Sequence, residues 1–252
     1  MLLKDKVVFV TGAASGIGAA GAVAMAREGA DVTLSDINGE GASAVASAIR
    51  AEGGRAHAVT LDAGDARQMA AAIADCAARH GRLDVLHSHP GIQIEGTLEQ
   101  VTVEDMDASW RLNVRSHFVA AKAAMAVMKP ARKGSIIITA SGSGVQYDSE
   151  MIAYATTKHA AVAMARQIAK DYGRHNVRVN ALCPGFIDTP FNRGFEIQMG
   201  GRDKLEDYIS GQIPMQRFGT VEEMADAIVF LASDRSTFMT GHAFVVDGGE
   251  CL

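Results

Sequence analysis

A tyrosine, a lysine and a serine between residues 134 and 174 have the types and the spacing of an acid–base site. Tyr154 and Lys158 are four residues apart on a predicted helix, so both side chains lie on one face, one turn apart. A neighbouring ammonium stabilises a phenolate, so we expect Lys158 to lower the pKa of Tyr154 from its usual value of about 10. Tyr154 would then work as a general acid or base. Ser141 follows an apolar strand 13 residues before Tyr154 and can hydrogen-bond a substrate oxygen beside the phenol.

A glycine-rich segment follows the first apolar strand. Residues 11–18 read TGAASGIG and lead into an alanine-rich helix. The glycines allow a tight turn and let a pyrophosphate approach the first turn of the helix, where free N–H groups and the helix dipole favour an anion. Such a turn also serves as a plain helix cap, but a strand before it and a helix after it indicate a dinucleotide site.

An acidic residue ends the second predicted strand. Asp36 stands near the offset at which an acid takes a ribose hydroxyl, and its carboxylate would repel a 2′-phosphate. The neighbouring Ile37, Asn38 and Ser15 offer no cation, so the sequence favours NAD over NADP. Taken alone, Asp36 is also compatible with a solvated strand end. Asp62, at the end of the third strand, fits the adenine amino group in the same way.

The segment 84–92, DVLHSHPGI, carries two closely spaced histidines. Alternate residues of a strand share a face, so His87 and His89 could converge on a metal ion. A third ligand is not evident nearby, and metal sites of this kind need one. Pro90 removes a backbone donor and fixes φ. We therefore predict an unusual cofactor loop and no metal site.

The elements that position these residues alternate along the whole chain. Strands are predicted at 6–11, 31–35, 56–61, 83–87, 135–139, 177–182 and 243–246, and helices near 16–28, 39–52, 65–80, 102–128, 151–174 and 221–232. Apolar strands that alternate with helices predict a parallel sheet covered on both faces. We predict one doubly wound α/β domain over residues 1–252. One long irregular stretch, about 184–220, is interpreted as an active-site lid over 186–213.

The composition excludes several classes of function. The 252 residues carry a net charge of −5, so no basic excess indicates a nucleic-acid partner. No apolar run approaches the roughly 18 residues of a membrane span. The N-terminal sequence runs straight into a strand pattern without the cleavage site of a signal peptide. Three cysteines, Cys76, Cys183 and Cys251, are too far apart for a disulfide framework or zinc knuckle. A cytoplasmic protein is expected.

Several motifs in the same order resemble the short-chain dehydrogenase/reductase family over nearly the whole chain. They are TGAASGIG, the strand end at Asp36, Asn113 in RLNVRSHF, Ser141, YATTK, RVNALCPGFIDTP, PMQRFG and TGHAFVVDGG. The resemblance implies a Rossmann-type sheet of about seven parallel strands, a bound NAD and a homotetramer. Where the family reads D-x-L-V-N-N-A-G-I, this chain retains Gly91 but has Ser88, His89 and Pro90.

The resemblance also implies roles for the catalytic residues. Tyr154 would move the proton of a hydroxyl or carbonyl, and Lys158 would lower its pKa and hold the nicotinamide ribose. Ser141 would orient the substrate oxygen, and Asn113 would position a water in the proton relay. Hydride would pass between the cofactor and the carbinol carbon, with no metal needed.

Motifs and resemblance together predict two sets of contact residues. The cofactor set is Gly12, Ser15, Gly16, Ile17, Gly18, Asp36, Asp62, Ala63, His89, Gly91, Tyr154, Lys158, Pro184, Gly185, Ile187 and Thr189. The substrate set is Ser141, Ser143, Tyr147, Tyr154, Phe186, Phe191 and Phe195. Ser143 lies close to Ser141, but the 13-residue interval selects Ser141 as the catalytic serine. His159 is expected to face away from the catalytic residues as a surface or packing residue.

Two functions remain open at this stage. The phenylalanines favour an apolar secondary alcohol or ketone, such as an alicyclic or aromatic one, although they could equally cover the core or an oligomer interface. Reduction of acyl-carrier substrates is disfavoured, because those enzymes mostly use NADPH and Asp36 opposes it. The alternative to an enzyme is a non-catalytic NAD-binding sensor or subunit. The intact set of Ser141, Tyr154, Lys158 and Asn113 favours the enzyme, whereas the altered loop favours the alternative.

Overall fold

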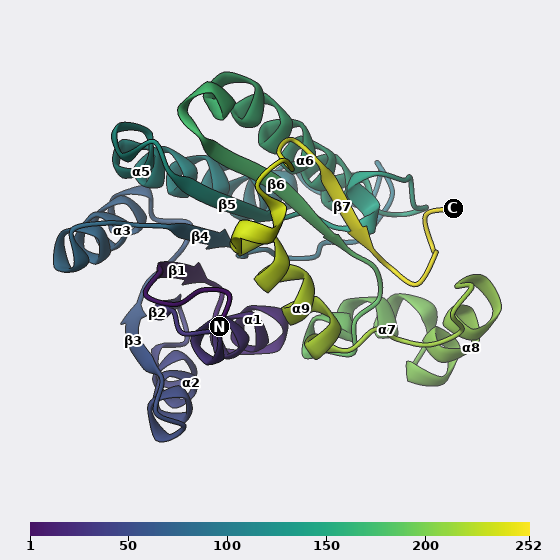
Figure 1. Cartoon of the computed structure of the whole chain (residues 1–252). Coiled ribbons are helices and arrows are strands. Elements are labelled where there is room, and N and C mark those ends of the chain that lie inside the picture. Colours follow the sequence, from purple (N-terminus) through teal and green to yellow (C-terminus); the bar gives the residue numbers. More distant parts are fainter.

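Seven parallel strands form the centre of the computed structural model, which describes residues 1–252 (Figure 1). Their order across the sheet is β3-β2-β1-β4-β5-β6-β7. The strands are β1 (Val7–Thr11), β2 (Asp31–Asp36), β3 (Arg55–Thr60), β4 (Val85–Ser88), β5 (Gly134–Thr139), β6 (Val177–Pro184) and β7 (Ala243–Val246). The predicted doubly wound α/β fold is confirmed, and every predicted strand is present with bounds shifted by two residues at most.

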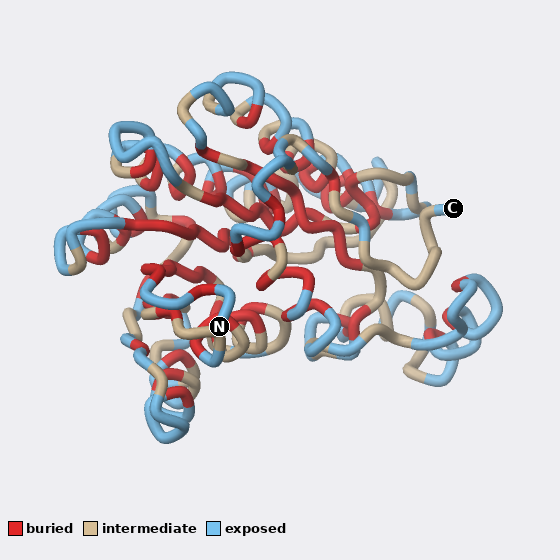
Figure 2. The backbone as a smooth tube through the Cα atoms, in the orientation of Figure 1, coloured by how far each residue is buried: buried red, intermediate tan, exposed pale blue.

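Helices cover both faces of the sheet. They are α1 (Gly16–Arg27), α2 (Gly39–Ala51), α3 (Ala66–His80), α4 (Val103–Trp110), α5 (Ser116–Ala131), α6 (Ile152–Tyr172), α7 (Arg193–Met199), α8 (Arg202–Gln212) and α9 (Val221–Ala232). Helices α3, α5 and α6 pack on one face, and α1, α2 and α9 pack on the other. Successive strand residues point to opposite faces, so Phe9 joins the first core while Val8 and Val10 join the second. Figure 2 shows the buried strands between these two layers.

The strand order reverses its direction between β1 and β4. Parallel connections run outward from this pair on both sides, so the loops after β1 and β4 separate and leave a crevice at the carboxyl ends of the strands. The glycine segment follows β1, and the histidine segment forms the end of β4 and the loop after it. The fold therefore brings the two unusual segments together at the place where doubly wound sheets bind ligands.

The helix expected over 102–128 is interrupted. Thr102 and Asp105 form a reciprocal capping box that begins α4, and a π-helical segment, Arg111–Arg115, separates α4 from α5. This segment contains Asn113, which is fully buried. Hydrophobic periodicity does not distinguish a π segment from an ordinary turn, whereas π segments often mark functional sites.

The stretch 184–220, expected to be irregular, is largely helical. A short 3₁₀ turn, Pro190–Asn192, leads into α7 and then α8. Leu205 and Ile209 are four residues apart on α8 and, with Ile213, bury a small apolar core of their own. The glycines at 200 and 201 separate two helices that are each too short to show a clear period in the sequence. In Figure 1 the pair projects to one side of the sheet, at the lower right.

None of the helices combines the length and the apolar character that crossing a membrane requires.

Candidate active site

A cavity of about 860 Å³ lies at the carboxyl ends of the strands. It runs from Asp36, at the end of β2, past the glycine segment and the end of β5 to α7 and α8. Its lining includes all the predicted substrate residues and all the predicted cofactor residues except Gly18. Asn113 is buried behind the wall and does not line the cavity. One continuous space therefore connects the two ends of the predicted site.

The glycine segment forms a cradle between β1 and α1. Gly12 and Gly16 have φ values of +67° and +54°, a region that side chains rarely adopt. Ser15 precedes the first turn of α1 and faces the cavity together with Gly16 and Ile17. Gly18 does not contact the cavity; a Cβ there would collide with the Gly12 carbonyl oxygen. The absence of a side chain allows the helix to pack closely against the turn, and the assignment of Gly18 to the cofactor set stays a prediction.

The acid at the end of β2 is held by the backbone. Asp36 Oδ2 accepts a hydrogen bond from the Ala14 N–H at 3.0 Å, and Oδ1 accepts one from the Asn38 N–H at 2.9 Å. The carboxylate is therefore fixed beside the cradle, and the exposed Ile37 stands next to it. The sequence did not single out the nearest basic side chain at this end, Arg111. It lies on the π segment, 3.6 Å from the Asp62 carboxylate, and the long-range contact leaves no local signal.

Tyr154, Lys158 and Ser141 meet at the centre of the cavity. Tyr154 and Lys158 are each only 4% exposed, and the Lys158 Nζ lies 5.4 Å from the centre of the Tyr154 ring. Lys158 Nζ donates to the Thr139 carbonyl oxygen at 3.3 Å, and Ser141 lines the same cavity as Tyr154. The Ser143 N–H donates to the Ser141 Oγ at 3.2 Å, which orients that hydroxyl. The structure thus brings together the three residues that the spacing selected.

Burial governs the ionisation of this group. It raises the pKa of Tyr154 to about 12, and the hydrogen bond from Ser141 opposes this only in part. It also lowers the pKa of Lys158 to about 8. The direction for Tyr154 is opposite to the one expected from the sequence. The physical reason is that both groups are dehydrated, while the ammonium lies toward the ring and bonds to Thr139 instead of the phenol.

Asn113 connects the loop after β4 to α6. Its Oδ1 accepts from the Ile92 N–H at 2.8 Å, and its Nδ2 donates to the Ile92 carbonyl at 2.9 Å and to Thr157 Oγ1 at 3.0 Å. A Cβ on Gly91 would lie 3.2 Å from Asn113 Oδ1 and 3.3 Å from Lys158 Nζ. Both N–H groups of the side chain and one lone pair of its oxygen are therefore used to join the two elements. The water-positioning role implied by the resemblance stays a prediction.

The two histidines of the β4 segment meet on a threonine. Thr139 Oγ1 is 3.0 Å from His87 Nε2 and 3.0 Å from His89 Nδ1. A hydroxyl has one proton, so at least one of the two rings donates to it. The backbone N–H of His89 donates to Thr11 Oγ1 at 2.9 Å, and its ring lines the cavity beside Gly12. The segment therefore forms part of the cavity wall, with the histidines bonded to the end of β5.

A third buried histidine supports this arrangement. Ser88 Oγ lies 2.7 Å from His117 Nδ1, and both residues are fully buried. Burial lowers the pKa of His87 and His117 well below the ordinary value and that of His89 to about 4. All three rings are neutral at physiological pH. His117 lies 28 residues after His89, and no local pattern in the sequence connected the two.

Aromatic side chains surround the substrate end. Phe186 and Phe195 pack edge to face at 4.9 Å between ring centres, and Phe191 lies 6.2 Å from the ring of Tyr154. Tyr147 is largely exposed at the rim and stacks on His159 at 4.9 Å. His159 Nδ1 also lies 3.0 Å from the Ala155 carbonyl, and His159 does not line the cavity. Its predicted role as a packing residue agrees with this placement.

Carboxylates share the substrate end with the aromatic residues, and sequence reasoning missed them. Asp148, Glu150 and Glu250 line the cavity there, whereas Lys158 is the only basic side chain at that end. Burial raises the pKa of Glu250 to about 7, and the negative charges of Asp148 and Asp247 add to the effect. Glu250 comes from the C-terminal tail, far along the chain from the other wall residues. The apolar walls that the phenylalanines provide are therefore accompanied by an acidic rim that was not predicted.

Comparisons with known proteins agree with the fold and the site. Residues 12–250 match a family model described as enoyl-(acyl carrier protein) reductase. The chain is 34% identical over 249 residues to a 3-oxoacyl-(acyl-carrier-protein) reductase of Thermotoga maritima, which covers 99% of each chain. It is 36% identical over 254 residues to a trans-4-hydroxycyclohexanecarboxylate dehydrogenase of Sinomonas cyclohexanicum, with 98% of this chain and 93% of the other covered.

A crystal structure of levodione reductase superimposes with a TM-score of 0.95 at 30% identity and covers 99% of this chain and 98% of the other. The chain belongs to the short-chain dehydrogenase/reductase family, and it is an oxidoreductase. Members of this family bind a nicotinamide cofactor.

The residues of the cavity fit such a cofactor. The glycine cradle offers side-chain-free backbone before the first turn of α1, and Asp36 offers an anchored acceptor for ribose hydroxyls. A solved relative that is 33% identical, named as an NAD(P)-dependent gluconate 5-dehydrogenase of Beutenbergia cavernae, holds NADP at low occupancy. The comparisons thus do not distinguish NAD from NADP for this chain, and its preference depends on its own residues.

The raised pKa of Glu250 predicts a pH-dependent penalty on stability. Between about pH 4.5 and pH 7 the folded chain retains a proton on Glu250 that the unfolded chain has lost, so stability decreases as pH rises through this window. We expect Glu250→Gln to leave the melting temperature unchanged at pH 4.5 and to raise it at pH 8. Thermal unfolding at both pH values measures this, with Asp75→Asn, an exposed acid on α3, as the control. An equal shift at both pH values would contradict the prediction.

Proposed function

We propose that this chain is an NAD-dependent oxidoreductase that interconverts a secondary alcohol and its ketone. The observation that carries the proposal is the single cavity that connects Asp36 and the glycine cradle to Ser141, Tyr154 and Lys158. A protein that only bound the dinucleotide would require Asp36 and the glycine cradle but not Ser141, Tyr154 and Lys158. The bound nicotinamide would supply or accept the hydride.

The residues of the chain would hold the substrate oxygen and move its proton. The Ser141 hydroxyl lines the cavity together with Tyr154 and would turn its proton to the oxygen of a ketone there. Tyr154 is protonated at neutral pH because of its burial, so it is suited to donate a proton to that oxygen. Oxidation of an alcohol would require the pKa of Tyr154 to fall. Lys158 is the one cation within reach that could stabilise the phenolate.

Support for NAD over NADP comes from the charges around Asp36. A 2′-phosphate would meet the Asp36 carboxylate, and Ile37, Asn38 and Ser15 provide no compensating charge. Arg111 is the only basic side chain that lines the adenine end, and it is paired with Asp62.

The substrate end favours a neutral or cationic ring over an anion. Phe186, Phe191 and Phe195 provide flat apolar walls, while Asp148 and Glu250 would repel a negatively charged group. We propose an alicyclic secondary alcohol without an acidic substituent. Two relatives are named for trans-4-hydroxycyclohexanecarboxylate and for levodione, and the first of these is an alicyclic alcohol that carries a carboxylate. The acidic rim also opposes the acyl-carrier activity for which another relative is named. The homotetramer implied by the resemblance stays a prediction.

The second candidate is a non-catalytic NAD-binding sensor or subunit. The feature that favours it is the loop after β4, where Pro90 lacks a backbone donor at the cavity wall. The two candidates differ in whether any alcohol is turned over.

A substrate panel separates the two functions. We expect at least one alicyclic secondary alcohol to reduce NAD, and Tyr154→Phe to lower kcat/KM by roughly 10²- to 10⁴-fold because the proton donor is lost. NADH absorbance measures this reaction, and a second assay follows the reduction of 3-oxoacyl thioesters with NADPH. The control is Tyr172→Phe, which removes a hydroxyl at the far end of the same helix. If no alcohol or ketone reacts with either cofactor, the sensor replaces the enzyme as the proposed function.

The role of Asp36 predicts a change of cofactor preference. Asp36→Asn keeps the shape of the side chain but removes its charge, so repulsion of a 2′-phosphate is lost. We expect KM for NAD to rise by roughly 10- to 100-fold and the discrimination against NADP to shrink. Steady-state kinetics with both cofactors measure this, with Asp107→Asn, an exposed acid on α4, as the control. A wild type that prefers NADP would overturn the assignment of NAD.

The loop after β4 is tested by restoring the family residues. The backbone and phosphate contacts expected of the cofactor lie mainly elsewhere, and Pro90 removes a single donor. We therefore expect wild type to bind NAD, and the double variant His89→Asn/Pro90→Ala to change Kd by less than about tenfold. Isothermal titration of NAD into both proteins measures this. Binding only by the double variant would show that the loop blocks the site.

A further inference from the structure

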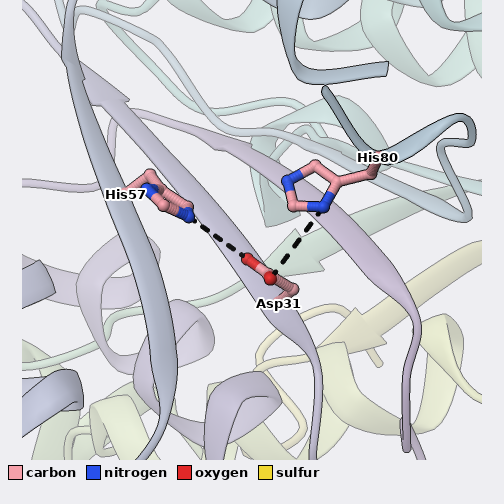
Figure 3. A group of neighbouring side chains, drawn as sticks. All are labelled: Asp31, His57 and His80. Carbon is pink, nitrogen blue, oxygen red and sulfur yellow. Dashed lines mark ion pairs between the residues drawn. The ribbon is translucent and has the colours of Figure 1, made fainter. Parts of the chain in front are cut away.

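We propose that Asp31, His57 and His80 form a zinc site at the amino end of the sheet, separate from the cavity. Asp31 begins β2, His57 lies on the edge strand β3, and His80 is the last residue of α3. Figure 3 shows the carboxylate of Asp31 between the two imidazole rings. One ligand atom from each residue lies within 4.8 Å of the other two.

The distances between the imidazole nitrogens and the Asp31 oxygens suit a shared ion better than direct hydrogen bonds. His57 Nε2 lies 3.9 Å from Asp31 Oδ1, and His80 Nδ1 lies 4.0 Å from Asp31 Oδ2. Both are too long for hydrogen bonds. Two ligands bound to one zinc ion at about 2.0–2.1 Å lie about 3.3–3.4 Å apart in a tetrahedron, and at most about 4.2 Å. A contraction of less than about 1 Å in each of these two pairs, together with a closer approach of the two histidines, would complete the geometry.

An unsatisfied acceptor points to a missing partner. Asp31 Oδ1 is buried and receives no hydrogen bond, although a buried carboxylate oxygen without a donor is costly. Arg55 Nε lies 3.5 Å from the other oxygen, Oδ2, and its guanidinium also reaches Asp5 and the Gly29 carbonyl. Oδ1 therefore remains available to a cation that approaches from the side of the histidines.

The donor set has the chemistry of a zinc site. Two imidazoles and one carboxylate are common zinc ligands, and a water would fill the fourth position. The His57 side chain is 48% exposed, so an ion has access and the ring has room to move, whereas Asp31 and His80 are 15% and 17% exposed and largely fixed.

The fold fixes this juxtaposition through the register of β2 and β3. Thr33 pairs with His57, and Thr33 Oγ1 contacts Cys76 Sγ at 3.3 Å, which places α3 over the same face. His80 follows Cys76 by one turn, and Gly81 ends the helix in a left-handed conformation. Asp31 and Asp36 are at opposite ends of β2, roughly 16 Å apart. A bound ion would fasten the edge strand to α3 without touching the cavity.

The test is titration of the tag-free, metal-stripped full chain with zinc chloride by calorimetry. We expect one zinc per chain. The affinity should be at least roughly 100-fold weaker for His80→Ala and for His57→Ala, which changes the more exposed of the two histidines. His242→Ala, an exposed histidine elsewhere, should bind like wild type. Arg55→Gln should bind more tightly, because it removes a cation that competes for Asp31.

Thermal unfolding gives a second measure that does not depend on activity. At about 100 times Kd, zinc should raise the melting temperature of wild type by roughly 5–10 °C and leave His57→Ala unchanged. Absence of 1:1 binding tighter than about 10 µM, equal affinity in wild type and both histidine variants, or weaker binding by Arg55→Gln would each overturn the site.

Discussion

Thr139, the last residue of β5, is the point at which the parts of the site are joined. Its hydroxyl bonds to both His87 and His89, and its carbonyl accepts the ammonium of Lys158. One residue therefore connects the loop after β4 to the helix that carries Tyr154 and Lys158. Because its hydroxyl has a single proton, at least one of the two histidine rings donates to it. The position of Lys158 depends on a strand end that is itself held from both sides.

The parallel sheet makes these contacts of Thr139 possible. Parallel strands deliver all their carboxyl ends to one edge, and the reversal of strand order between β1 and β4 leaves that edge open. Ser88 and His89 stand where the family usually has two amides at the end of β4. Ser88 is hydrogen-bonded to His117, and His87 and His89 are hydrogen-bonded to Thr139. These hydrogen bonds support the altered loop, which forms part of the cavity wall.

The sequence was most informative where chemistry and spacing are local. The glycine turn, Asp36 and the Tyr154–Lys158 pair could be located because a strand-turn-helix pattern or a helical repeat fixes their geometry. Arg111, His117 and Glu250 could not, because each reaches the site through contacts far along the chain. The sign of the Tyr154 pKa shift was also out of reach, since burial is a property of the whole fold. Short helices such as α7 carry too few residues to display a period.

The π-helical segment at Arg111–Arg115 changes the direction in which side chains point about the helix axis between α4 and α5. A π turn contains about one residue more than an α turn, and one residue corresponds to about 100° of rotation about the helix axis. The two helices continue each other yet present different sides to the sheet, so α4 buries little beyond Ser109 while α5 buries a full apolar stripe. Asn113 lies in this π segment, and the added rotation directs its side chain inward. The hydrogen bond from Asn113 to Thr157 on α6 therefore depends on the number of residues in one turn as well as on the identity of the side chain.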